Sequence, residues 1–329
     1  WWKEMEDLSL PIGNTPMLEI EYLYKGRRDK FFAKLESYNL TGSIKDRAAY
    51  YILKKAIDSG KLKPGQAIAE ASSGNFGLGI AAIGKILGFD VHIFMPGFAT
   101  EERKQLLKLY GATLHLNYDE HDAFNIALTN CHKFAQENGA FETLQFENMD
   151  NVNSHYEGVG KEIEKEVGDK VGAFIAGIGS GGTFAGVAKR MKELDKNIKT
   201  YCVEPNNMPI LSGGKVSGHS KISGIADDFL PSIVDPKLIE GVIGVEDDDA
   251  INMSRKLSKE IGLGVGISSG AYTIGAILLN EKVEKPVVTI FADDNKKYLS
   301  TELADENIQY DNPEYISNQV RFINVKKIN

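Results

Sequence analysis

Long apolar runs are missing from this chain of 329 residues. No stretch reaches the roughly 20 consecutive apolar residues that a membrane-spanning helix needs. The N-terminus, which starts at Trp1, also lacks the basic, apolar and small-residue segments of a signal peptide. We therefore expect a soluble protein with no membrane partner.

Cysteine is scarce, and so are blocks of basic residues. Cys131 and Cys202 are far apart and lack the spacing of a disulfide framework or a zinc site. We expect no metal site, and we expect a reducing, cytoplasmic location. The formal net charge of -8 is spread along the chain, so no segment is suited to a nucleic-acid backbone. We expect no nucleic-acid partner.

Short apolar stretches alternate with amphipathic segments, a pattern that predicts an α/β fold with mostly parallel sheets. The expected strands lie at Ala67–Ala69, Val91–Met95, Ala173–Ile178, Tyr201–Val203 and Val287–Phe291. Two series of such units, about 46–146 and 170–295, predict two closely packed α/β lobes with a cleft between them. The polar stretch from about Tyr310 is interpreted as a tail or a dimer arm.

A glycine-rich turn follows the expected strand near residue 175 and opens a helix. It reads Gly179, Ser180, Gly181, Gly182 and Thr183. Free backbone N–H groups at a helix N-terminus, with no Cβ in the way and two hydroxyls nearby, form a good phosphate site. The alternative is a turn that merely caps a helix. No P-loop lysine and no GxGxxG pattern is present, which argues against nucleotide.

A second turn of the same kind follows the expected strand near residue 68. It contains Ser72, Ser73, Gly74 and Asn75. Its hydroxyl, amide and backbone donors are suited to an anion such as a substrate carboxylate. The alternative is an ordinary serine cap on the following helix.

Lys45 stands at a loop-to-helix junction. The positive end of a helix dipole favours the neutral, nucleophilic form of an amine, which an aldehyde-binding lysine requires. The alternative is a solvated lysine.

Taken together, these motifs resemble the cysteine synthase and cystathionine β-synthase family of pyridoxal-phosphate enzymes, which have the fold type II architecture. The resemblance covers nearly the whole chain, and its segments occur in the family's order. They are Ile12–Pro16, Gly42–Arg47, Ser72–Asn75, Gln145–Asn148, Gly179–Thr183, Gly224–Ile225, Gly266–Gly270 and Tyr298–Ser300.

The resemblance implies pyridoxal 5'-phosphate as the cofactor, held in the cleft as a Schiff base on Lys45. It implies further cofactor contacts at Gly179, Ser180, Gly181, Gly182, Thr183, Gly224 and Ser268, with Ser268 facing the pyridine nitrogen. It implies substrate contacts at Ser72, Ser73, Gly74, Asn75, Phe76 and Gln145. Asn75 would also contact the phenolic oxygen of the cofactor.

The resemblance also implies how the chain is divided and assembled. Residues 41–146 would form a smaller, mobile domain on the substrate side. Residues 1–40 and 147–329 would form the larger domain that binds the cofactor phosphate. We expect a homodimer on the same grounds.

Two departures from the family pattern bear on the reaction. The loop after Ile225 carries Asp227 and Asp228, where sulfhydrylases have small residues. A carboxylate there would repel sulfide and act as a base towards water or a thiol, unless both aspartates face solvent. Phe76 replaces the usual threonine, so it either narrows the pocket or points into the core.

These departures favour β-elimination and β-replacement on L-cysteine through an aminoacrylate, with release of hydrogen sulfide and addition of water, to give L-serine, or of a thiol. The main alternative is a cysteine synthase that uses O-acetylserine and sulfide. A threonine or serine dehydratase and a diaminopropionate-type synthase are more distant alternatives. A non-enzyme relic that binds the cofactor would lack the lysine, and Lys45 is present.

Overall fold

The computed structural model describes residues 9–72, 74–119, 122–225 and 229–328. Within these residues the larger β-sheet has seven strands in the order β11-β1-β2-β10-β7-β8-β9. Their bounds are β1 (Met17–Tyr24), β2 (Arg27–Leu35), β7 (Ala173–Gly177), β8 (Lys199–Pro205), β9 (Gly241–Val245), β10 (Val287–Phe291) and β11 (Val320–Lys327). Strand β1 is antiparallel to β2 and β11, whereas the strands from β2 to β9 run parallel in the sheet.

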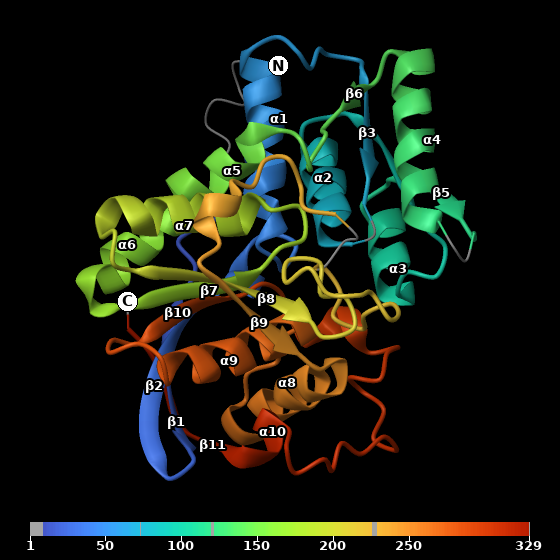
Figure 1. The fold of residues 1–329 in the computed structure, drawn as a ribbon. Coiled ribbons are helices and arrows are strands. Elements are labelled where there is room, and N and C mark those ends of the chain that lie inside the picture. The colour runs from blue at the N-terminus through green and yellow to red at the C-terminus, as the bar shows by residue number, and fades with distance from the viewer. Residues whose placement is uncertain (1–8, 73, 120–121, 226–228, 329) are drawn as a thin grey trace.

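Helices cover both faces of this large sheet (Figure 1). On one face lie α5 (Met149–His155), α6 (Lys161–Val167) and α7 (Gly182–Leu194), and on the other lie α8 (Asp247–Ile261) and α9 (Ile267–Asn280). The short α10 (Ile316–Gln319) packs on α8. A parallel sheet is buried on both faces, which explains the continuous burial of β7 and β10.

The smaller sheet is parallel, with the strand order β5-β4-β3-β6. Its strands are β3 (Ala67–Ala71), β4 (Asp90–Pro96), β5 (Thr113–Asn117) and β6 (Phe141–Glu142). Its helices are α1 (Lys45–Asp58), α2 (Asn75–Ile86), α3 (Glu101–Leu109) and α4 (Ala123–Asn138). Ile68 and Ile93 pack in the cluster of α1 and α2, while Ala69 and Phe94 pack against α4. This alternation follows from the two-residue period of a strand.

The predicted α/β fold is confirmed, and each of the five expected strands overlaps a strand of the structure. The interpretation of the last segment as a tail is wrong for residues 320–327, whereas its interpretation as a dimer arm stays a prediction. They form β11, which pairs with β1 along its length. Val320 and Phe322 are buried, but the strand pattern is hidden because most of the residues after Phe322 are exposed.

The division at residues 40/41 and 146/147 stays a prediction. It is supported by the two sheets, whose apolar clusters are separate. None of the described helices combines the length and apolar character needed to cross a bilayer.

Candidate active site

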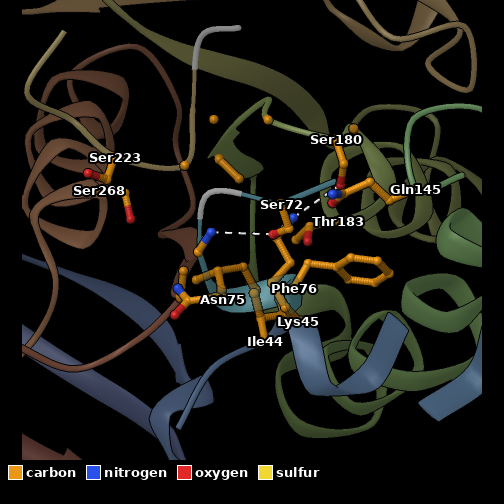
Figure 2. Close-up of a pocket in the computed structure, with 18 of the residues that line it drawn as sticks. Ile44, Lys45, Ser72, Asn75, Phe76, Gln145, Ser180, Thr183, Ser223 and Ser268 are labelled. Atoms are coloured by element: carbon orange, nitrogen blue, oxygen red, sulfur yellow. Dashed lines mark hydrogen bonds between the residues drawn. The ribbon is translucent and has the colours of Figure 1, made fainter. Parts of the chain in front are cut away.

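Four helices begin at the edge of one pocket. Helix α1 begins at Lys45, α2 at Asn75, α7 at Gly182 and α9 at Ile267, and residues from the first turn of each line the pocket. In Figure 2, Ser223 and Ser268 lie on one side, Gln145, Ser180 and Thr183 on the other, and Lys45 and Asn75 between them. The first N–H groups of a helix are unpaired and carry positive partial charge, so the pocket is suited to anions.

The turn between β7 and α7 depends on its glycines. Gly181 has a φ of 88°. A Cβ at Gly179 would lie 2.3 Å from the carbonyl oxygen of Gly224, and a Cβ at Gly182 would lie 1.9 Å from Asn151 Oδ1. Side chains at these positions are therefore excluded, and the backbone itself forms this wall of the pocket.

The amine of Lys45 contacts this same turn. Lys45 Nζ donates a hydrogen bond to Ser180 Oγ over 3.1 Å, although the two residues are 135 positions apart. Asn151 Nδ2 also donates to Ser180 Oγ, over 3.0 Å. The predicted lysine and the predicted phosphate turn thus meet within the pocket (Figure 2).

The turn between β3 and α2 forms the facing wall. Ser72 Oγ accepts hydrogen bonds from the backbone N–H of Gly77 at 3.0 Å and of Gly74 at 3.3 Å. Ser72 therefore caps α2, as the simpler interpretation holds, and neither bond uses its hydroxyl hydrogen. Ser73 lies outside the described residues.

The side chain of Asn75 has a hydrogen-bond partner, Asp293, that the sequence did not predict. Its Nδ2 donates to Asp293 Oδ2 over 2.7 Å, and Tyr298 donates its phenol proton to the same oxygen, also over 2.7 Å. Asn75 Oδ1 and Asp293 Oδ1 are buried without a hydrogen-bond partner. Two unsatisfied buried oxygens next to a pocket mark a place where a ligand or water completes the hydrogen bonding.

The side-chain amide of Gln145 forms hydrogen bonds with residues of β3. Its Nε2 donates to Glu70 Oε1 over 2.6 Å and to the carbonyl oxygen of Ala71 over 3.1 Å. Both amide hydrogens are thereby used. The expected contact of Gln145 with a substrate carboxylate requires this amide to rotate, and it stays a prediction.

Three other predicted positions also line the pocket: Gly224, Ser268 and Phe76. Ser268 is buried on the first turn of α9. Phe76 is 2% exposed and belongs to the apolar cluster around α2, so it both borders the pocket and packs in the core. Asp227 and Asp228 lie outside the described residues.

Several pocket residues were missed from the sequence, namely Arg103, Phe124, Phe146, Tyr272 and Tyr298. The ring of Phe146 lies between those of Phe124 and Phe229, with centroid distances of 5.8 Å and 5.4 Å. Phe146 and Tyr298 were within segments of the family resemblance and could have been found there. Arg103 and Phe124 carry no local signal.

Glu70 lies on β3 behind Gln145 and is 2% exposed. Burial raises the pKa of its carboxyl to about 8. The hydrogen bonds from Thr143 and Gln145 and the charge of Lys45 lower the pKa less than burial raises it, and Glu142 raises it further. The Glu70 carboxyl is therefore protonated at neutral pH, a state in which it can bond Thr143 and Gln145 without a buried charge.

A pH series tests this protonated state through stability. Native Glu70 keeps its proton up to pH about 8, whereas the unfolded chain releases it near the ordinary value of 4.5. Between these values the native state binds more protons, so the free energy of unfolding falls as pH rises, by at most about 1.4 kcal/mol per pH unit. We expect Glu70→Gln to gain stability relative to wild type between about pH 5 and pH 8, as measured by urea unfolding.

Glu137→Gln on the exposed side of α4 is the matched control, and its difference from wild type should change little over the same range. A Glu70→Gln difference that stays constant with pH would rule out a neutral Glu70.

Comparison with known proteins places these features in a family. The model of the family described as "Pyridoxal-phosphate dependent enzyme" matches residues 8–293. The chain belongs to this family. Within the described residues no cluster of three or more His, Cys, Asp or Glu side chains is arranged to hold a metal ion.

Similar members of the pyridoxal-phosphate dependent enzymes cover almost the whole chain. A cysteine synthase of Staphylococcus aureus is 36% identical over 304 residues, which are 92% of this chain and 97% of that protein. The solved structure of a hydrogen sulfide-producing enzyme from Fusobacterium nucleatum is 42% identical, with a TM-score of 0.93 and 100% of both chains covered. An Asp-to-Asn variant of that enzyme, in complex with an alpha-aminoacrylate intermediate, has a TM-score of 0.92 and 43% identity, and covers 99% of this chain and 100% of that chain.

The pocket fits pyridoxal phosphate. A phosphate needs hydrogen-bond donors that no side chain shields, and the glycine turn leaves no room for a Cβ at two positions. The aldehyde needs a primary amine, which Lys45 Nζ supplies next to Ser180. Ser268 and Asn75 line the same pocket and can form hydrogen bonds with the polar atoms of the cofactor ring.

Proposed function

We propose that this protein catalyses β-elimination and β-replacement on L-cysteine, with water as the second reactant. L-cysteine and water give L-serine and hydrogen sulfide: the bond from Cβ to sulfur breaks and a bond from Cβ to oxygen forms. The observation that supports this proposal is the Lys45 amine, which lies in one pocket with the two turns that are predicted to bind anions. The similarity to the hydrogen sulfide-producing enzyme over the full length of both chains supports the choice of reaction.

We infer the roles of the side chains from the family resemblance, and from their positions where the structure describes them. When bound, pyridoxal phosphate supplies an aldehyde that forms a Schiff base with an amine and a ring that accepts the electron pair released at Cα. We assign to Lys45 the removal of the Cα proton and its delivery to the departing sulfur. The turn from Gly179 to Thr183 binds the phosphate, and Ser72, Ser73 and Asn75 orient the substrate carboxylate.

We assign the activation of water to Asp227. This proposal rests on the sequence departure after Ile225, and the Asp-to-Asn variant of the related enzyme, in complex with its aminoacrylate intermediate, supports an aspartate that acts in the second half-reaction. A carboxylate there would take a proton from water or from a thiol as it attacks Cβ.

Cysteine synthase is the second candidate function, because curated relatives at 36% identity carry that name. Both reactions use the same first steps at Cα and Cβ, and differ in the group that leaves and the group that adds. On family resemblance we further propose that the protein is a homodimer in the cytoplasm.

Product analysis separates the two candidates. We expect the holoenzyme to release sulfide from L-cysteine and to form L-serine in equal amount, measured by a colorimetric sulfide assay and by chromatography. Rapid formation of L-cysteine from O-acetylserine and sulfide, with no sulfide released from L-cysteine, would instead establish a cysteine synthase.

Asp227→Asn and Asp228→Asn form a matched pair within the same assay. We expect Asp227→Asn to slow serine formation about 10²-fold or more, while the visible absorbance of the cofactor is retained. Asp228→Asn should keep most of its turnover. The reverse result would transfer the role to Asp228.

A further inference from the structure

Arg103 is a buried cation on the wall of the pocket. It lies on the first turn of α3, is 6% exposed, and lines the pocket together with Gly74 and Tyr298. Its guanidinium carbon is 5.0 Å from the ring centroid of Tyr298. Stacking on an aromatic ring orients a guanidinium, but it does not replace a counter-charge.

The charge of Arg103 is not balanced by an ion pair among the described residues, and its buried Nε has no hydrogen-bond partner. Asp293, which acts on the same Tyr298 as Arg103, receives its hydrogen bonds from Asn75 and Tyr298. The equally buried Arg47 shows the contrast, since it contacts both Glu36 and Glu162. A buried charge is costly unless it is paired. Arg103 is therefore suited to form an ion pair with an anionic ligand.

The position of Arg103 points to which anion this is. It packs against Gly74, where a Cβ would lie only 3.3 Å from Arg103 Nε and Cζ. Gly74 precedes the first residue of α2, so the guanidinium and the positive end of this helix lie next to one another. No side chain of residue 74 separates the guanidinium from this turn, which is the turn expected to hold the substrate carboxylate.

We propose that Arg103 pairs with the α-carboxylate of the amino-acid substrate and makes the pocket selective for substrates that carry this charge. This inference rests on the proposed function only in that the substrate is an amino acid. Arg103 lies beside the Gly74 turn on the pocket wall, so the carboxylate would contact both a helix N-terminus and a guanidinium. The cofactor phosphate, the other anion of the site, is held by the turn at Gly179.

Ligand binding to the holoenzyme tests this role without any turnover. L-serine carries the carboxylate and L-serine methyl ester does not, and the change in visible absorbance of the cofactor gives the Kd of each. A hydrogen bond to a charged group is worth about 1.5–3 kcal/mol, so we expect Arg103→Met to weaken L-serine about 10- to 100-fold. Binding of the ester should change less than about 3-fold, by the same reasoning. Arg103→Lys should keep part of the preference for L-serine.

The controls separate charge recognition from structure. Lys108→Met removes a cation from the exposed face of the same helix and should leave both Kd values unchanged. Equal weakening of L-serine and its ester in Arg103→Met would show a structural role and overturn the proposal. Unchanged binding of both would overturn it as well. Weaker binding of pyridoxal phosphate, with L-serine unaffected, would assign Arg103 to the phosphate instead.

The outcome does not depend on which reaction the protein catalyses. If the holoenzyme released no sulfide from L-cysteine, the ratio of the two Kd values would still measure the contribution of Arg103. Failure of the proposed function and failure of the proposed carboxylate contact are therefore seen in different experiments.

Discussion

Lys45→Ala should lower sulfide release from L-cysteine by at least about 10³-fold, because the proposed roles of this one amine are to bind the aldehyde and to transfer the Cα proton. The structure offers no substitute nearby: among the described residues that line the pocket, Lys45 is the one lysine. Its Nζ is 3.1 Å from Oγ of Ser180, a residue of the turn that is predicted to bind the cofactor phosphate. The substitution therefore removes the amine that lies next to this turn. Wild-type protein should lose its visible band on borohydride treatment and keep the cofactor covalently attached, and the variant should not.

Lys54→Ala is the matched control for Lys45→Ala. Lys54 lies on the same helix and forms an exposed ion pair with Asp58. Exposed pairs of this spacing contribute about 0.3–0.5 kcal/mol, so the control should keep both turnover and colour. Turnover in Lys45→Ala above about a tenth of wild type would be incompatible with both catalytic roles given to this lysine.

Local sequence signals predicted the turns of the site well. Glycines that cannot accept a Cβ, hydroxyl residues and a following helix are neighbours in the chain, so a short segment contains the whole signal. The same is true of the buried parallel strands such as β7 and β10, whose residues are apolar throughout. The hairpin of β1 and β2 was missed because its turn at Lys25 and Gly26 is flanked by the charged, exposed start of β2.

Contacts between distant segments could not be predicted in this way. Gln145 and Glu70 are 75 residues apart, and Asn75 and Asp293 are 218 apart. The first pair forms because β3 and β6 are neighbours in the small sheet. The second forms because residues that follow β3 and β10, strands of two different sheets, meet at the pocket. A buried glutamate or arginine is unusual on its own, but the sequence does not show that Glu70 and Arg103 are buried. The structure is therefore needed to distinguish these residues from solvated charges.

A buried network of charges holds the first turn of α1, which carries Lys45, to the large sheet. Arg47 Nε donates to Glu36 Oε2 and Arg47 Nη1 donates to Glu162 Oε1, both over 2.6 Å. The carboxylate of Glu162 also accepts from Lys34 Nζ, at 2.9 Å. The side chains of Lys34 and Glu36 are completely buried, and that of Arg47 is 4% exposed. The network thus joins β2, α1 and α6.

Removal of the central cation should be strongly destabilising. In Arg47→Met, Glu36 would remain buried with hydrogen bonds from Thr15 and Asn39 but no cation, while Glu162 would retain Lys34. Breaking a buried ion pair from one side costs about 3–5 kcal/mol, because the remaining charge is left uncompensated. We expect a loss of this size in the free energy of unfolding, measured with urea at saturating cofactor, and a loss of turnover at temperatures where wild type is still folded.

Two further variants show whether the uncompensated charge is the cause. Glu36→Gln in the Arg47→Met background removes that charge and should restore part of the lost stability. Arg28→Met breaks an ion pair with Glu21 in which the arginine side chain is 67% exposed, and it should cost less than about 1 kcal/mol. Equal effects of Arg47→Met and Arg28→Met would contradict the assignment. Because Arg47 is two residues from Lys45 on the same helical turn, we expect the network to hold the position of the Lys45 amine as well, so that Arg47→Met lowers stability and turnover together.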